Sequence, residues 1–223
     1  MKKFFVSLCA VALFAVSASA QFVNSTQGAG QSANHEKVWN TVSISYSPIS
    51  ATVMGMEAAD LNALSVAWTQ ARSVLSTHPL YVEYGLGAQW SFMTNSVNSD
   101  YSTSKSSSHY LSLKAPVSVL YKFTFGDVAL MPLAGLDLGC YVLGKEKAES
   151  TVSYAGQSET YTAETDLFAE GNYNRFIFNW HVGARVAYKK VFLGIGYEGP
   201  ITSLQSDYKI KTSQFNISLG LTF

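Results

Sequence analysis

The chain has 223 residues, with 15 basic side chains against 15 acidic ones and a mean hydropathy of only +0.10. The balanced charge excludes a broad basic surface for nucleic acid, and the low hydropathy excludes a bundle of membrane helices. Charged residues make up 13% of the chain, about half the share usual in soluble domains, whereas aromatic residues reach the same 13%. This combination favours a β protein whose surface faces something other than water.

The N-terminus has the pattern of a secretory signal peptide. Lys2 and Lys3 form a basic start, residues 4–16 are an apolar run, and Ala18-Ser19-Ala20 matches a small-residue cleavage site. The apolar run is about 13 residues, shorter than the ~20 needed to span a bilayer. We therefore expect cleavage before Gln21 and export of the mature chain.

Beyond this segment, apolar and polar residues alternate repeatedly, which is the period of a β-strand with two unlike faces. The alternation is clearest where Phe215, Ile217, Leu219, Leu221 and Phe223 are separated by polar or small residues. No stretch carries 18 uninterrupted apolar residues, so we expect no transmembrane helix. The pattern predicts strands at about 38–53, 61–74, 80–92, 111–123, 128–144, 176–188, 191–199 and 214–223.

The composition of the two strand faces indicates the surroundings of the sheet. The second face consists of Gly, Ser, Thr, Asn and isolated charges, whereas a soluble sandwich would carry many Lys and Glu there. The apolar face covers about ten residues per strand, the length that a tilted strand needs to cross a bilayer. Unpaired backbone groups in hydrocarbon cost several kcal/mol each, so such strands must close. We predict an all-β fold, an eight-stranded antiparallel transmembrane β-barrel with a narrow lumen.

The lengths of the connections predict which end of the barrel lies outside. Short links at about 126–127 and 189–190 contrast with long ones at about 95–109 and 145–175. Outer-membrane barrels have short periplasmic turns and longer external loops, so the long links are expected outside the cell.

The 145–175 link has the most distinctive content of the external loops. Residues 151–162 read as a hairpin that continues its flanking strands, and Glu164, Asp166 and Glu170 follow it. We consider this link a candidate binding surface for a partner, a glycan or a cation. The alternative is a solvated, variable loop.

Several short sequence segments resemble those of a known family. They are SLKAPV at 112–117 followed by YKF at 121–123, WHVGA at 180–184, VFLGIGYE at 191–198, and the closing Phe223. The chain resembles the small outer-membrane β-barrel proteins of Bacteroidetes, the porin-T-like barrel family, similar in architecture to the transmembrane domain of outer membrane protein A. The resemblance implies a place in a Gram-negative envelope and recognition of Phe223 by the barrel-assembly machinery. It implies no shared catalytic residues.

Isolated charges on the inward face are the candidate functional residues of the barrel. Buried charges must be paired and hydrogen-bonded, so we interpret them as pairs that seal a narrow lumen, with a proton or ion pathway as the alternative. We expect Lys114 near Glu198 towards the external end and Lys122 near Glu83 towards the periplasmic end. The lumen set comprises Glu83, Lys114, Lys122, Asp137, His181, Arg185 and Glu198.

No catalytic, cofactor or metal site is expected. A barrel hydrolase acting on lipid would need Ser, His and an acid on the outer surface, whereas His181 should point inward. Cys140, the single cysteine left after cleavage, has no cationic neighbours that would activate its thiol. The four histidines lie on separate segments without zinc-site spacing: His35, His78, His109 and His181.

The function expected from these features is a monomeric outer-membrane barrel of structural or surface-interaction type, without catalysis, that contacts membrane lipid and displays external loops. The alternative is a narrow pore or a component of a secretion assembly, and an enzyme comes third. The expected organisation is a signal peptide at 1–20, a periplasmic lead segment at 21–37 and the barrel at 38–223.

Overall fold

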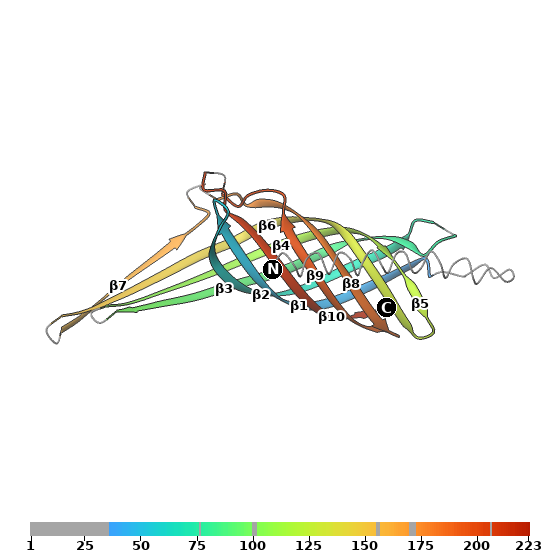
Figure 1. Ribbon diagram of the computed structural model, residues 1–223, viewed down its shortest axis with the longest axis horizontal. Helices are drawn as coiled ribbons and strands as arrows, with labels where there is room; N and C mark the ends of the chain where they lie inside the picture. The colour runs from blue at the N-terminus through green and yellow to red at the C-terminus, as the bar shows by residue number, and fades with distance from the viewer. Residues whose placement is uncertain (1–35, 76, 100–101, 155–156, 170–172, 206) are drawn as a thin grey trace. The chain divides into compact units, whose positions relative to one another are not determined.

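The computed structural model describes residues 36–223 except 76, 100–101, 155–156, 170–172 and 206 (Figure 1). The signal peptide expected at 1–20 and nearly all of the lead segment expected at 21–37 lie outside the described residues. No helix in the described part is long and apolar enough to cross a membrane. The strands are β1 Val38–Val53, β2 Met56–Ser73, β3 Leu80–Ser99, β4 Ser102–Tyr121, β5 Phe123–Phe125, β6 Val128–Tyr154, β7 Gln157–Asp166, β8 Phe176–Tyr188, β9 Val191–Pro200 and β10 Lys211–Thr222.

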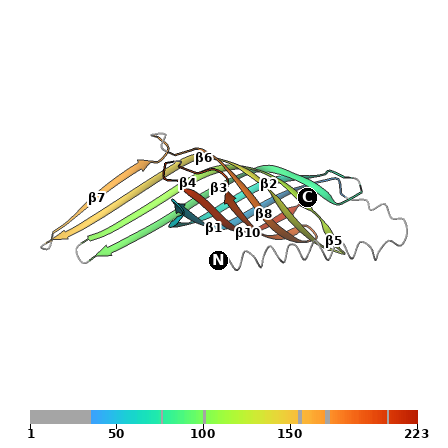
Figure 2. The same cartoon turned by 45° about the horizontal axis from the view of Figure 1, so that its top comes forward.

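Eight of these strands form a closed antiparallel ring (Figures 1 and 2). Neighbours pair in chain order, β10 pairs with β1, and β4 pairs directly with β6. The short β5 continues β4 alongside β6, and β7 pairs with β6 outside the ring. Closure leaves no open edge in the ring, so its backbone groups are satisfied by neighbouring strands. The predicted eight-stranded antiparallel barrel is confirmed.

The ring has an apolar outer face and a largely polar inner face. Ile44 on β1, Leu86 on β3 and Leu219 on β10 are 61%, 66% and 51% exposed on the outside. Their sequence neighbours Ser43 and Ser218 line the inside. This arrangement is the reverse of a soluble barrel and is that of a transmembrane β-barrel.

The two ends of the ring differ in their connections. At one end lie the two-residue turns Gly126-Asp127 and Lys189-Lys190. β10 ends at the same end of the ring, because Thr222 N donates to Lys190 O in the second turn at 2.8 Å. The opposite end carries the longer hairpins and the 201–210 loop. Apart from the connection between β1 and β2, the short and long connections therefore alternate in the predicted order.

One connection at the long-hairpin end is much shorter than predicted. Met54 and Gly55 have φ angles of 51° and 86°, which is the positive-φ pair of a tight hairpin turn. This turn pairs Val53 with Met56, so β2 begins at Met56 rather than at about 61. The sequence does not indicate that β2 starts at Met56, because the apolar alternation weakens where the strand extends beyond the apolar outer face of the ring.

The serine-rich 95–109 segment is a hairpin and not the loop that we predicted. β3 runs to Ser99 and β4 begins at Ser102, with Asn95 opposite Ser106. The hairpin predicted within 151–162 is present, since Thr151 lies opposite Thr160. Backbone pairing continues in both places although the apolar alternation stops, because both faces of these hairpins carry mainly polar residues.

Together these hairpins form a four-stranded sheet beyond the ring, in the order β3–β4–β6–β7 (Figure 1, left). β2 pairs with β3 only as far as Phe92, and β8 pairs with β6 only as far as Cys140. The projecting segments have seven to ten residues, a reach of about 25–30 Å. We define the external sheet as residues 93–99, 102–108, 145–154 and 157–166.

Candidate functional site

Cross-strand register places several chemically active side chains in one row inside the ring. Glu83 lies opposite Ser118, Ser118 opposite Gly135, Gly135 opposite His181, and His181 opposite Glu198. The row therefore crosses β3, β4, β6, β8 and β9. The sequence predicted the inward side of these positions, but the row itself depends on how far each strand is shifted against the next.

The Glu83 carboxylate is held by Arg185 of β8. Nη1 and Nη2 of the guanidinium donate to the two oxygens of Glu83 at 2.6 and 2.8 Å. The same guanidinium lies over the Phe192 ring at 5.1 Å. Glu83 is only 2% exposed, so this two-point ion pair supplies the compensation that a buried carboxylate requires.

The Glu198 carboxylate is the centre of a second buried network. Lys114 Nζ donates to both of its oxygens, at 2.9 and 2.7 Å. Asn179 Nδ2 donates to the same group at 2.6 Å, and the Gln214 amide makes a short bond to it. Gln89 extends the network by donating to Gln214 at 3.2 Å. The structure thus brings Lys114 and Glu198 together, and neutral amides complete their hydrogen bonding.

The third cluster joins Ser118, His181 and Asp137. Ser118 Oγ lies 2.7 Å from His181 Nε2, and His181 Nδ1 lies 2.5 Å from Asp137 Oδ2. Gly135 leaves space for this contact, since a Cβ there would lie 2.8 Å from His181 Nε2 and 2.7 Å from Ser118 Cα. The sequence alone does not connect Ser118 with His181, because the two residues lie on different strands. Gly135 lies between the two residues in the register and leaves room for their contact. Its role can be recognised only when the strand pairing is known.

Lys122 is separate from these networks. Its Nζ lies 3.2 Å from Glu36 Oε2 and 4.6 Å from the Trp39 ring centre, at the end of the ring that carries the short turns. The expected pairing of Lys122 with Glu83 is therefore not what the structure shows. The long Arg185 side chain reaches Glu83 from across the lumen.

Apolar clusters occupy both ends of the lumen in the described part of the chain. We define the inner plug as the buried cluster at the short-turn end, and the outer plug as the two clusters near the external sheet, which share Tyr110. The inner plug contains Trp39, Ala71, Tyr81, Leu120, Ala129, Met131, Ala187 and Phe192. The outer plug is built on Ile49, Leu61, Ala63, Phe168, Ile177 and Leu204.

A polar cavity of about 160 Å³ lies in the lumen. Ser118, Asp137, His181 and Arg185 line one part of it. The opposite wall is made of small residues, mainly Ser43, Ser45, Ser65 and Ser218 from β1, β2 and β10. The sequence difference between the two walls explains the hollow: serine and glycine on one side cannot fill the space that longer side chains leave on the other.

The histidines and Cys140, at which the sequence predicts no metal site and no reactive thiol, lie apart from one another among the described residues. No group of three or more His, Cys, Asp and Glu that could hold a metal occurs among the residues described. His109 stacks against Trp90 with ring centres 6.0 Å apart, and His35 lies outside the described residues. Cys140 is a half-buried free thiol on β6.

The external sheet carries charge that is nearly all exposed. Lys145 pairs with Glu164 at 3.1 Å, and Lys147 pairs with Glu149 at 2.6 Å. Because of this bond, the pKa of Lys147 is raised and that of Glu149 is lowered. Three lysines against five carboxylates give the sheet a net charge of −2. Glu170, the last acidic residue singled out in this link, lies outside the described residues.

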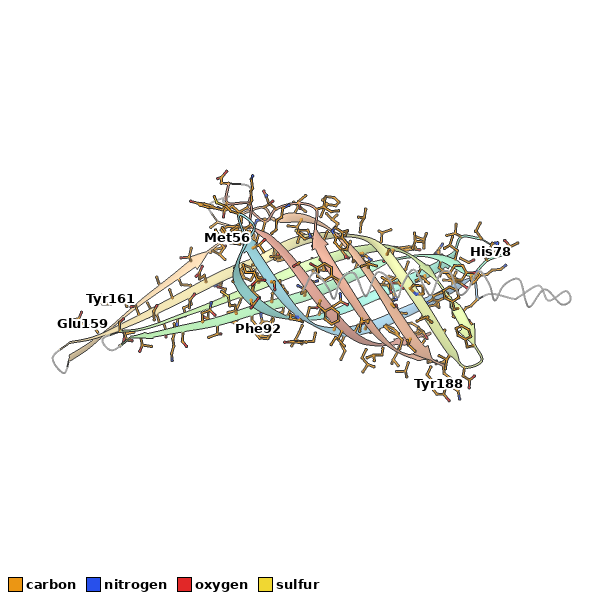
Figure 3. All side chains as sticks on the ribbon, viewed as in Figure 1. Met56, His78, Phe92, Glu159, Tyr161 and Tyr188 are labelled. Carbon is orange, nitrogen blue, oxygen red and sulfur yellow. The ribbon has the colours of Figure 1, made fainter. Side chains whose placement is uncertain are left out.

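The far hairpin of the external sheet presents a polar aromatic side chain. Tyr161 is 61% exposed, and its hydroxyl donates to Glu159 Oε2 at 2.5 Å. This hydrogen bond to a carboxylate raises the pKa of Tyr161. Figure 3 shows both residues near the hairpin tip, at the end of the molecule opposite His78 and Tyr188.

Comparison with known proteins finds structures of similar fold but no matching family. No protein-family model and no curated protein matches the chain. Among solved structures, Ail, the attachment invasion locus protein of Yersinia pestis, crystallised with the heparin analogue sucrose octasulfate, is 14% identical, with coverage of 84% of this chain and 100% of Ail and a TM-score of 0.43.

Two further barrels are similar to the same extent. Neisserial surface protein A is 13% identical over 82% of this chain and 97% of its own, with a TM-score of 0.42. The outer membrane enzyme PagL is 12% identical over 80% and 97%, with a TM-score of 0.45. At these values no function is transferred, and the barrel is assigned from the pairing of its own strands.

Proposed function

We propose that the chain is an outer-membrane β-barrel that holds an interaction surface, the external sheet, outside the cell. The observation that carries this proposal is the continuity of β3, β4 and β6. β3 and β6 begin in the apolar ring and run on into the polar sheet, and β4 begins in the polar sheet and runs back into the ring. A membrane anchor and a projecting surface are thereby built from the same strands.

The apolar outer face supports placement in a lipid bilayer. Leu64, Val117 and Leu193 are 50%, 52% and 56% exposed, and each belongs to a strand whose inner face is already packed. In water this surface would favour aggregation, whereas in a bilayer it meets hydrocarbon. The proposal includes export through the expected signal peptide, recognition of Phe223 by the assembly machinery, and membership of the Bacteroidetes barrels that the sequence resembles.

The external sheet supports a surface-interaction role. Its outer strands, residues 93–99 of β3 and 157–166 of β7, pair with a strand on one side only within the described part of the chain. Their free backbone groups and the polar side chains on both faces suit recognition through hydrogen bonds. The proposal is that the barrel is a monomer and that its external sheet binds a surface partner without catalysing a reaction.

The plugs argue against the pore alternative. Conduction needs a continuous polar passage, but the inner plug packs Trp39 against Tyr81 with ring centres 4.3 Å apart. The cavity between the plugs is only about 160 Å³, so it does not form a passage through the ring. Discrete conductance steps from the refolded protein in planar bilayers would contradict this part of the proposal.

Topology in intact cells tests the proposal. In a Cys140→Ser background, a membrane-impermeant maleimide should label Ser104→Cys in the external sheet on intact cells. Lys189→Cys in a short turn should be labelled only after the outer membrane is ruptured. Labelling of Lys189→Cys on intact cells, or of both variants only after rupture, would contradict the proposed display.

A photo-crosslinking amino acid tests the interaction itself. Placed at Thr160 in β7, it should give discrete adducts of higher mass on intact cells. The same amino acid at Asp127, in a short turn, is the matched control and should not give those adducts. Equal adduct patterns at both positions would contradict an interaction role for the external sheet.

A further inference from the structure

We propose that Ser118 is a nucleophile, activated by His181 and oriented through Asp137, that accepts acyl groups from small esters in the barrel lumen. This inference concerns the inside of the ring and goes beyond the proposed role of the external sheet. It also departs from the expectation of a barrel without catalysis, which considered a hydrolytic site only on the outer surface.

The order of atoms is that of a serine nucleophile with its base. Ser118 Oγ is 2.7 Å from His181 Nε2, and the other ring nitrogen, Nδ1, is 2.5 Å from Asp137 Oδ2. The carboxylate holds the proton on Nδ1, which leaves the Nε2 lone pair directed at the Ser118 hydroxyl. Nucleophile, base and orienting acid are thus in contact in the required sequence.

The backbone makes room for this contact. The three side chains come from three adjacent strands, and Gly135 lies between Ser118 and His181 in the register. A Cβ at Gly135 would lie 2.1 Å from Val117 O as well as within 2.8 Å of the imidazole. Any residue larger than glycine would push the ring away from Ser118.

The surroundings also fit an acyl transfer. Ser118, His181 and Asp137 line the same cavity of about 160 Å³. Because apolar clusters close both ends of the lumen, a small molecule must displace side chains of the outer plug to enter, and it would then lie against all three residues. Arg185 lines this cavity too, and its guanidinium is fixed by Glu83, the residue directly opposite Ser118 on β3.

The cavity volume restricts the substrate. A space of about 160 Å³ is below the usual ~300–1,000 Å³ of ligand pockets, so only short acyl groups such as acetyl fit.

The reaction balances without a cofactor. Ser118 Oγ attacks the carbonyl carbon while His181 Nε2 takes the hydroxyl proton, and the alcohol leaves with that proton. Water then attacks the acyl-serine, His181 takes one proton of the water, and the carboxylic acid leaves as Ser118 regains its proton. The sum is ester plus water to acid plus alcohol.

Labelling of the refolded full-length protein tests the proposal. A small dialkyl fluorophosphate should modify Ser118 at least ~100-fold faster than Ser43, because general-base assistance contributes about 10²–10⁴ in rate. Ser43 lines the same cavity and serves as a control within the same molecule. Peptide mass mapping over time gives both rates, so the result does not depend on any variant folding.

Three variants and one substrate series complete the test. His181→Gln should slow labelling of Ser118 by ~100-fold or more, Asp137→Asn should slow it less, and Ser104→Ala in the external sheet should leave it unchanged. Hydrolysis of 4-nitrophenyl acetate should exceed that of 4-nitrophenyl decanoate and be lost in Ser118→Ala. Equal labelling of Ser118 and Ser43, or acetate hydrolysis unchanged by Ser118→Ala, would overturn the proposal and leave the three residues a structural hydrogen-bond chain.

Discussion

The ring and the external sheet are built from the same strands but meet different surroundings. In the ring every strand has two neighbours, one face meets lipid and the other encloses buried charge. In the external sheet β3 and β7 each have one neighbour, and most side chains are exposed. The comparison shows that backbone pairing extends the strands in both regions, whereas the surrounding medium decides which side chains they carry.

The largest expected difference between the two regions concerns their ion pairs. Arg185→Met would leave the Glu83 carboxylate buried without a partner, so we expect a loss of about 3–5 kcal/mol in the free energy of unfolding. Urea titration of the protein refolded in lipid measures it. The double variant Glu83→Gln/Arg185→Met should recover most of the loss, because no unpaired charge remains.

Lys147→Met in the external sheet is the matched control for Arg185→Met. Lys147 also forms a short ion pair, with Glu149, but both side chains are solvent-exposed. Exposed pairs contribute little, so no measurable change in unfolding is expected. A loss for Lys147→Met as large as that for Arg185→Met would contradict the division into a buried ring and a solvated sheet.

Shortening the external sheet should affect the ring much less. Replacing residues 96–105 with Asn-Gly joins Asn95 to Ser106, which already lie opposite each other. We expect the free energy of unfolding in lipid to change by less than ~0.5 kcal/mol, because the strand partners of the removed residues lie in the external sheet and not in the ring. A loss above ~2 kcal/mol would show that the sheet is needed to hold the ring together.

The smallest expected effect is a change of ionisation in the external sheet without a change in stability. Glu159 raises the pKa of Tyr161 by accepting a hydrogen bond from the neutral phenol, which must be broken when the proton leaves. Glu159→Gln should therefore lower the pKa of Tyr161 towards its ordinary value. Ultraviolet difference titration against a Tyr161→Phe blank measures it, and an unchanged pKa would contradict the contact.

The strands of the ring could be predicted from sequence because one face of each strand meets lipid and the other faces the polar lumen. β8 was predicted at 176–188 and is observed at Phe176–Tyr188. The outer part of β4 could not be predicted as a strand, because Ser104 and Ser106 alternate with residues that are equally polar. Apolar periodicity detects burial and not backbone pairing, so a strand with solvent on both faces resembles a loop.

The contents of the lumen were predictable, but most of their contacts were not. Alternation placed His181 and Arg185 on the inner face, where the structure finds them. It could not show that Arg185 reaches Glu83 or that His181 meets Ser118, because those contacts depend on the shift between strands. Lys114 and Glu198 were matched correctly only because both lie at the same level of the barrel.

The transmembrane orientation of the ring is tested most directly by two adjacent residues of β1, one facing lipid and the other facing the lumen. Ile44 is 61% exposed on the outer face, and Ser43 lines the lumen cavity. Ile44→Lys should lower the unfolding free energy in lipid by about 2–4 kcal/mol, because a lone ammonium in hydrocarbon has no partner. Ser43→Lys places its charge in a polar cavity and should cost clearly less. A neutral Ile44→Lys together with a costly Ser43→Lys would mean that the strand is inside out and that this is a soluble β protein.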